Sequence, residues 1–462
     1  MKHLINSLKF EVHCSDEWQA FNLRANFAQT FQPQIQAVVD RVCSELVPED
    51  QLVRIDQLEI EMGNFSQHAF GANFESVFAY KFEQALRAQL ARSTPGQKET
   101  AIRLSAIETT EYFLETGNLP WWISERDIDF EEMNIAVFED QDLPMQLFFD
   151  AQRENVVLWR RVAWQMTSAA KTSLIQFFSE LRAALQLLQT WRASLSILLE
   201  TSPGTVFKVI LSDALLQTLV LLQAPVIFRT SDVSGSLWLP FVEEIRKEGQ
   251  VNNIAGADIE AFIDTLSLKE NIPEAASSVQ HAPIMEMPPE HVYDAPDERY
   301  FVSHAGIILL TPFFKQLFTQ LELFEEGEWT SFEAHMKAVH LLGFLSTGQQ
   351  QLPEYALALE KIICGMPVAM PIRMDIELNA VDIANCNDLL QAVIAHWTVL
   401  KNTSIDGLRG NFLVRDGLLT SHENGWQLRV ERKTLDVLLD QLPWGFTTAA
   451  FPWRQDLILT EW

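Results

Sequence analysis

The sequence predicts a mainly α protein with small α+β elements. These are an N-terminal β-α-α-β-α unit, a helical middle, and a C-terminal helical domain with a β-hairpin. Apolar residues recur at spacings of three and four over most of the chain, which is typical of amphipathic helices. Two segments near the N-terminus instead alternate apolar and polar residues, as half-buried strands do. A chain of 462 residues that is 48% hydrophobic has enough material for two to four packed domains.

The first predicted domain spans residues 1–92. Alternation over 3–13 and over 52–62 predicts two strands, and Gly63-Asn64 ends the second. Helical spacing of apolar residues predicts three helices in the same domain. The first is capped by Asp16 and reaches Phe31, the second follows Pro33 as far as Leu46, and the third covers 70–91.

The second predicted domain, residues 98–269, is helical throughout. The apolar spacing predicts helices at 100–115, 139–164, 173–199, 205–222 and 259–268. Turns are expected at Gly117-Asn118, Pro144, Ser202–Gly204 and Ser234-Gly235. No fixed-period repeat is evident, so the pattern does not favour a solenoid.

Residues 270–299 read as a proline-rich linker without periodicity, which separates the middle from a C-terminal domain at 300–462. That domain is expected to contain helices at 306–323, 331–347, 353–364, 380–401 and 406–415. A β-hairpin follows, with strands at 413–420 and 426–432 and a turn at 422–425. A short helix at 435–442 leads into an extended end that is rich in Pro and Trp.

The net charge of −28 excludes several classes of partner. Binding to nucleic acid, or to an anionic membrane surface, needs clustered Lys and Arg, so neither is expected. The apolar segment 214–228 is interrupted by Gln217, Gln223 and Pro225, which predicts a buried helix ending at Pro225 and no membrane insertion. The N-terminus has no apolar signal-peptide core, so we expect the chain to be made and kept in the cytoplasm.

No catalytic, cofactor or metal motif is present. The sequence has no glycine-rich nucleotide loop, no H-E-x-x-H and no G-x-S-x-G. The four cysteines (Cys14, Cys43, Cys364 and Cys386) form no C-x-x-C pair and are expected to be reduced core thiols. We therefore expect no cofactor, and the residues alone indicate no reaction.

Five histidine, serine and cysteine residues are candidates for chemistry: Ser303 and His304, which are adjacent, His335, His340 and Cys364. Adjacent Ser and His side chains do not point at each other, and His335 and His340 are five residues apart, which puts them on different faces of a helix. Cys364 would need a nearby base to be reactive. A structural role is the favoured interpretation of each.

Three tryptophans near the C-terminus, Trp444, Trp453 and Trp462, could form a platform for carbohydrate. Their neighbours Pro443, Phe446, Phe451 and Pro452 are instead typical of a packed terminal segment, so we expect packing rather than sugar binding.

A series of motifs in the last third resembles one family, the contractile injection system tape measure proteins. In order, the matching positions are Ala305-Gly306, Ile308–Phe313, Ala338–Leu342, Thr347-Gly348, Pro353-Glu354, Cys364–Pro367, Trp397, Leu400–Ser404, Leu408-Arg409, Phe412-Leu413, Arg415–Gly417, Trp426, Leu428–Glu431, Leu442–Trp444, Pro452-Trp453 and Glu461-Trp462. Near the N-terminus, Arg54–Gly63 is similar to a family strand motif. His304, Val414 and Asp416 depart from the family pattern.

The resemblance marks a set of family-motif residues with an expected structural or docking role. They are Asp56, Gly63, Gly306, Pro312, Phe313, Gly365, Pro367, Trp397, Asn402, Thr403, Ser404, Arg409, Glu431, Pro443, Trp444, Pro452, Trp453 and Trp462.

The resemblance implies a non-enzymatic assembly protein of a bacterial, phage-tail-like particle that sets the length of the inner tube. Implied partners are the inner-tube protein, the hub or spike and baseplate proteins, and the tube terminator; a homo-oligomer stays open. An assembly adaptor or chaperone at the baseplate or tube end is the alternative, and a tube-associated hydrolase comes third. Fully helical, the chain would span about 690 Å. Its predicted strands, nineteen prolines and amphipathic helices instead favour a compact isolated form, so we expect an extended form only inside the particle.

Overall fold

A computed structural model of the chain describes residues 31–47, 57–63, 67–90, 97–120, 130–139, 143–200, 211–230, 232–251, 256–269, 298–400, 402–422 and 425–462, with a few single positions between residues 5 and 123. The chain separates into two units, Met1–Glu108 and Thr109–Trp462. The predicted domain limits at 92, 98, 269 and 299 stay predictions, and the predicted linker lies almost entirely outside the described residues.

The described part of the first unit centres on the helices α2 (Gln32–Leu46) and α3 (Gln67–Leu90). They share an aromatic and aliphatic core in which Phe31 packs edge-on against Phe74, with ring centroids 4.8 Å apart. Pro33 lies in the first turn of α2, where its missing N–H costs no helical hydrogen bond. These two predicted helices are confirmed, whereas the helix predicted to end at Phe31 lies outside the described residues apart from Phe31 itself.

The predicted N-terminal β unit is not shown. The described residues of 3–13 and of 52–62 belong to no strand. Leu58, Ile60 and Met62 pack against the core of α2 and α3, while Gln57 and Glu59 are exposed. At residues 57–62, packing of every second side chain on this helical core accounts for the alternation without a strand.

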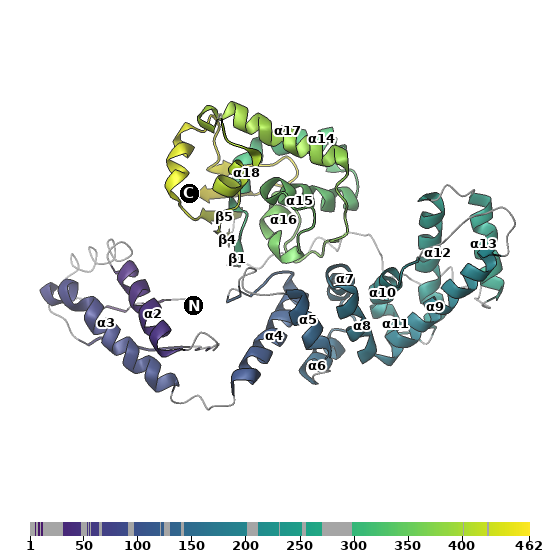
Figure 1. Ribbon diagram of the computed structural model, residues 1–462, viewed down its shortest axis with the longest axis horizontal. Helices are drawn as coiled ribbons and strands as arrows, with labels where there is room; N and C mark the ends of the chain where they lie inside the picture. The colour runs from purple at the N-terminus through teal and green to yellow at the C-terminus, as the bar shows by residue number, and fades with distance from the viewer. Residues whose placement is uncertain are drawn as a thin grey trace. The chain divides into compact units, whose positions relative to one another are not determined.

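Residues 109–269 of the second unit, called the helical region below, form short helices (Figure 1). They are α4 (Gln97–Thr116, which begins in the first unit), α5 (Phe130–Glu139), α6 (Leu143–Ala151), α7 (Val156–Gln165), α8 (Ser168–Phe177), α9 (Ser179–Glu200), α10 (Asp213–Leu222), α11 (Ala224–Ile227), α12 (Val233–Val251) and α13 (Gly256–Lys269). α10 packs against α7, α8 and α9, and α12 and α13 pack against α9.

Three predictions for the helical region were wrong in detail, each for a local reason. The single helix 139–164 is broken, because Pro144 lies in the first turn of α6 and Asn155 caps α7 by accepting a hydrogen bond from the N–H of Leu158 at 3.1 Å. The helix 173–199 is interrupted at Phe178. The turn at Ser234-Gly235 is helical, since the Asp232 carboxylate accepts from the N–H of Gly235 at 2.9 Å and starts α12.

Residues 298–462, called the C-terminal region below, combine helices with a sheet. Its helices are η2 (Ala305–Leu310), α14 (Thr311–Gln320), α15 (Phe332–Thr347), η3 (Glu354–Ala356), α16 (Ala358–Ile363), α17 (Ala380–His396), η4 (Thr398–Leu400), α18 (Ile405–Leu408), η5 (Arg409–Leu413) and η6 (Thr434–Gln441). Its strands are β1 (Arg299–Val302), β2 (Phe324–Glu325), β3 (Glu328–Trp329), β4 (Gly417–His422), β5 (Gly425–Val430), β6 (Thr448–Ala449) and β7 (Leu457–Glu461).

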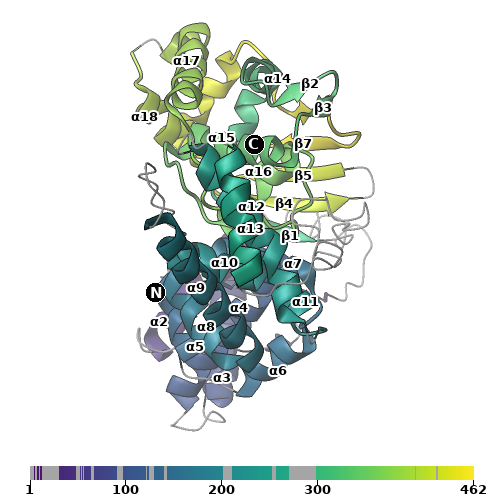
Figure 2. The same ribbon diagram turned by 90° about the vertical axis from the view of Figure 1, so that its right-hand side faces the viewer.

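The predicted hairpin is confirmed as β4 and β5, which pair from Gly417↔Val430 to His422↔Gly425. It is the centre of a larger sheet with strand order β1-β4-β5-β7-β6, and Figure 2 shows the first four of these strands in that order. β7 runs parallel to β5, and the other pairs are antiparallel. The end predicted to be merely extended therefore supplies two strands of the sheet.

One apolar core unites the C-terminal region. The inner sheet face contributes Tyr300, Leu419, Leu428 and Ile458, and η2, α14 and α15 add buried aliphatic and aromatic side chains to the same core. In the part of the chain that the structure describes, no helix is both long and apolar enough to cross a membrane.

Candidate functional site

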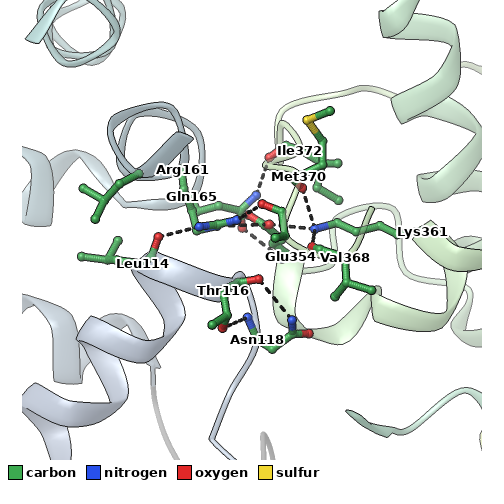
Figure 3. A network of polar contacts seen from close by, with 12 residues as sticks. Leu114, Thr116, Asn118, Arg161, Gln165, Glu354, Lys361, Val368, Met370 and Ile372 are labelled. Atoms are coloured by element: carbon green, nitrogen blue, oxygen red, sulfur yellow. Dashed lines mark hydrogen bonds and ion pairs between the residues drawn. The ribbon is translucent and has the colours of Figure 1, made fainter. Parts of the chain in front are cut away.

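A buried network of charges joins the helical region to the C-terminal region (Figure 3). We call Arg161, Gln165, Glu354 and Lys361, with the carbonyls they contact, the junction network. Arg161 lies on α7, and its side chain is 0% exposed, as is that of Glu354 at the start of η3. The Nε of Arg161 donates to both carboxylate oxygens of Glu354 at 3.2 Å.

Backbone carbonyls complete the donors of Arg161. One terminal nitrogen donates to the carbonyl of Leu114 in α4, and the other donates to the carbonyl of Ala369 in the C-terminal region. A guanidinium has a rigid fork of donors, so it fixes three partners in one geometry that a lysine could not reproduce. Arg161 therefore ties α4, α7 and the C-terminal region together.

Lys361 approaches the same carboxylate from α16. Its ammonium lies 2.7 Å from Oε1 of Glu354 and donates to the carbonyls of Val368 and Met370 at 2.8 and 2.7 Å. Two cations, Arg161 and Lys361, thus share one carboxylate. The backbone carbonyls that accept from them offset the rest of their positive charge. Because every donor of Lys361 has an acceptor, the desolvation of the buried charge is offset by hydrogen bonds.

Three neighbours seal the junction network. The side-chain amide of Gln165 donates to the carbonyl of Ile372 at 2.6 Å and accepts from the N–H of Glu354 at 3.0 Å. Gly117 is left-handed, with φ of +78°, and a Cβ there would come within 2.3 Å of Glu354 Oε1. The ring of Phe113 lies edge-on to Tyr355, with centroids 6.0 Å apart. A substrate would have no room at the carboxylate, so the network is a joint between two parts of the unit.

A second set of polar contacts involves the four tryptophans that belong to the family motifs, all in the C-terminal region. Each indole N–H donates to an acceptor that is distant in sequence. The partners are the carbonyl of Leu438 for Trp397 at 3.2 Å, that of Leu309 for Trp444 at 2.8 Å, that of Ile363 for Trp453 at 2.7 Å, and the Asp436 carboxylate for Trp462 at 2.9 Å.

The rings of the C-terminal tryptophans pack within the region. Trp453 lies against Phe324 and Trp329, with centroids 5.0 and 5.3 Å away, and Trp444 is edge-on to Phe313 at 5.1 Å. Phe446 contacts Trp462 in the same manner. The expectation of a packed terminal segment, rather than an open sugar-binding platform, is met at these positions.

Two motif glycines allow close approach of the backbone. A Cβ on Gly306 in η2 would lie 1.7 Å from the carbonyl oxygen of Phe412, so η2 and η5 touch backbone to backbone there. Gly365 ends α16 with φ of +74° beside Trp453. Pro312 lies in the first turn of α14, where proline is favoured.

The motif residues Asn402, Thr403 and Ser404 precede α18, and Arg409 follows it as the first residue of η5. Thr403 donates its N–H to the carbonyl of Leu400 at 2.8 Å, and Ser404 caps α18 by accepting from the N–H of Gly407 at 3.0 Å. Arg409 donates to the carbonyls of Leu345 and Phe344 at 3.1 and 3.2 Å, and so caps the end of α15. Asn402 is exposed in the preceding turn.

The remaining motif residues lie mainly at the surface. Pro443, Pro452 and Glu431 are exposed, as is Gly63 in the first unit, with φ of +82°. Pro367 is half-buried and accepts a hydrogen bond from Met370 in a turn. Asp56 lies outside the described residues. The structure thus gathers the C-terminal motif residues on one fold but does not bring them together at one point, and their docking role stays a prediction.

The residues weighed for catalysis have structural partners. His335 donates to the carbonyl of Cys364 at 2.8 Å, and burial lowers the pKa of its ring to about 4. His340 contacts the carbonyl of Arg373 at 2.6 Å. His304 does not face Ser303 but lies 3.2 Å from the buried carboxylate of Glu360.

The described cysteines are free thiols, and Cys364 and Cys386 are buried. Desolvation raises the pKa of Cys364 well above its usual value, so its thiol is neutral at physiological pH. Among the described residues, no group of three or more His, Cys, Asp and Glu side chains could hold a metal ion.

Comparison with known protein families decides the assignment. The family profile for contractile injection system tape measure proteins matches residues 2–462. The chain belongs to that family. No curated protein and no solved structure matches the chain.

Membership confirms the resemblance seen in the motifs. A tape measure protein has a structural role in setting tube length and is not an enzyme, which agrees with the structural partners of His335, His340 and Cys364. Family membership also associates the chain with tube and baseplate components of an injection particle.

The junction network was missed by sequence reasoning. Arg161 and Glu354 are 193 residues apart, and neither carries a local motif for the other. Two signals were present. Pro353-Glu354 is among the motif positions, and Arg160-Arg161 interrupts the apolar run from Val156 to Trp164, where buried arginines need a partner elsewhere in the fold. The partner itself could be found only from the tertiary structure.

Proposed function

We propose that this tape measure protein has separate docking and measuring parts. The C-terminal region docks on a component at one end of the tube, and the helical region is the segment whose length is measured. The proposal is carried by the contrast between the two parts. The C-terminal region is closed around one core by backbone contacts such as Gly306 on Phe412. In the helical region, by contrast, several described helices follow one another directly, as α8 and α9 do on either side of Phe178.

The docking part is supported by the rigidity of the C-terminal region. Indole hydrogen bonds join segments of this region that are distant in sequence, and they come from Trp397, Trp444, Trp453 and Trp462. The surface of the region therefore has one fixed shape. The net charge of −28 favours a basic or neutral surface on the partner. Within a particle of this kind, the inner-tube protein, the hub or spike and baseplate proteins, and the tube terminator are the partners of choice.

The measuring role of the helical region is supported by its construction from many separate helices. The helices α5 to α13 are 4–22 residues long. Caps separate several of them, such as Asn155 before α7 and Thr167 before α8, so the chain has boundaries at which whole helices can be inserted. We propose that the chain is made in the cytoplasm and ends inside the tube, where the helical region extends along the lumen.

Electron microscopy of particles from a strain that lacks the chain tests this function. Tubes of variable length, or no tubes, are expected for a length-setting protein. Tubes of normal length with arrested assembly would instead indicate an adaptor or chaperone. Normal particles that have lost lysis of the target would indicate a hydrolase.

A further inference from the structure

The junction network has a topological consequence for any measuring segment. Gln165 at the end of α7 is hydrogen-bonded to Ile372 of the C-terminal region, and residue 299 begins β1 in the sheet of that same region. Residues 166–298 therefore form a loop with both ends on one domain. A closed loop can reach only half its contour, which is about 100 Å if the segment is helical.

Opening the junction removes this restriction. With Arg161 and Gln165 released, residues 109–298 would run as a single strand of chain, and their helical contour is about 280 Å. Residues 166–298 alone would reach about 200 Å from the C-terminal region with the junction open, twice their reach with the junction closed, and residues 109–165 add the rest.

The composition of the joint suits it to opening. Among the described residues of α4 to α13, Trp164 alone packs against the apolar core of the C-terminal region, and it does so only partly buried. The other contacts described above are chiefly those of charged and amide groups, which water can solvate once the parts separate. A buried ion network gives a unique geometry with less net stabilisation than an apolar contact of the same size.

We propose that the junction network is a latch, which holds the helical region folded on the C-terminal region in the isolated chain and opens when the chain is built into the tube. This inference rests on the proposed measuring role of the helical region. The latch keeps the helices packed until a tube surrounds them. When it opens, residues 109–298 can extend along the tube, which a length measurement requires.

Site-specific photo-cross-linking tests the latch in the full chain and in the particle. The Tyr355 ring lies near Phe113 of α4, so Tyr355→p-benzoylphenylalanine is expected to cross-link to α4 in the purified chain. The matched control is Phe313→p-benzoylphenylalanine, which faces Trp444 within the C-terminal region. The expected result is loss of the 355 cross-link in assembled particles while the 313 cross-link stays. Retention of both cross-links in particles would overturn the latch.

A second variant tests whether the network itself holds the joint. For Arg161→Ala, small-angle X-ray scattering of the purified chain is expected to give a larger radius of gyration than the natural chain. Arg246→Ala, which removes an exposed Arg–Glu pair between α12 and α13, is expected to leave the radius unchanged. Equal radii for all three chains would contradict the proposal.

The proposed function and the latch can fail separately. If residues added to the helical region lengthen tubes but the 355 cross-link persists in particles, the measuring role stands and the latch is wrong. If tube length does not change with the added residues, the measuring role is wrong whatever the cross-link shows. The latch, which rests on that role, is then rejected as well.

Discussion

Replacing the shared carboxylate of the junction network is the sharpest test of its energetics. Glu354→Gln keeps the size and shape of the side chain but removes its charge. Arg161 and Lys361 would then face each other across a neutral amide, although both are at most 1% exposed. Breaking a buried ion pair by neutralising one partner costs about 3–5 kcal/mol, because the remaining charge stays buried without compensation.

The expected shift in melting temperature follows from the size of the unit. Thr109–Trp462 is the unit that contains the network. With an unfolding entropy of ~2.1 cal/mol/K per residue over about 350 residues, a loss of ~4 kcal/mol lowers Tm by about 5 °C. Differential scanning calorimetry of the full chain at pH 7 measures this shift.

The matched control is Glu260→Gln, because Glu260 pairs with Arg246 through two hydrogen bonds but is about half exposed. Exposed pairs contribute about 0–1 kcal/mol, so its Tm is expected to change by about 1 °C at most. If Glu354→Gln shifts Tm no more than this control, the junction network does not stabilise the unit and the reasoning fails.

Three further predictions concern the C-terminal region. Gly306→Ala is expected to destabilise it by about 3 kcal/mol or more in urea unfolding, because the new methyl group meets the Phe412 carbonyl; an unchanged midpoint would contradict the close approach. The neutral ring of His335 stabilises the fold fully above about pH 6.5, and this contribution, up to about 3 kcal/mol, is lost as the pH falls towards 4; His335→Gln should remove that part of the pH dependence, and an identical profile would refute it. Cys364 and Cys386 are expected to resist alkylation in the native chain at pH 8, since burial raises the pKa of both thiols, that of Cys386 to about 12; rapid modification seen by mass spectrometry would show that they are accessible.

Periodicity predicted helices well wherever one helix had one uninterrupted apolar stripe. α2, α3 and α15 agree with the predicted positions to within a few residues. It failed where the stripe continues across a break, as between α5 and α7, because Asn155 and Pro144 end and restart helices through backbone hydrogen bonding while the burial pattern persists. Local capping, rather than hydrophobicity, decided those boundaries.

The sheet was only partly predictable for a different reason. β4 and β5 are joined by a short turn, so their pairing is local and carries a sequence signal. β1 pairs with β4 across more than a hundred residues, and β7 joins β5 in parallel, which depends on how the whole C-terminal region folds. A five-residue strand such as Leu457–Glu461 has no local pattern that specifies its neighbour.

The motif residues were identified from the sequence, but the junction network was not. Trp453 and Gly306 are recognisable in the sequence because no other residue type would fit their positions. Gly306 has no room for a Cβ, and the indole of Trp453 fills space and donates a hydrogen bond. Arg161 and Lys361 are ordinary charged residues in the sequence, and the match at Pro353-Glu354 does not say what Glu354 contacts. Only the fold brings the three together as buried side chains. The prediction that the motif residues dock on a partner still awaits its test.

Tube length as a function of added residues tests the central claim most directly. A second copy of Val233–Lys269, which spans α12 and α13, would be inserted after Lys269, so that the existing packing of the helical region is kept. If the helical region measures the tube, particles should lengthen by about 55 Å for a helical insert and by up to about 125 Å for a fully extended one. A length distribution that coincides with that of the natural chain in electron micrographs would contradict the account.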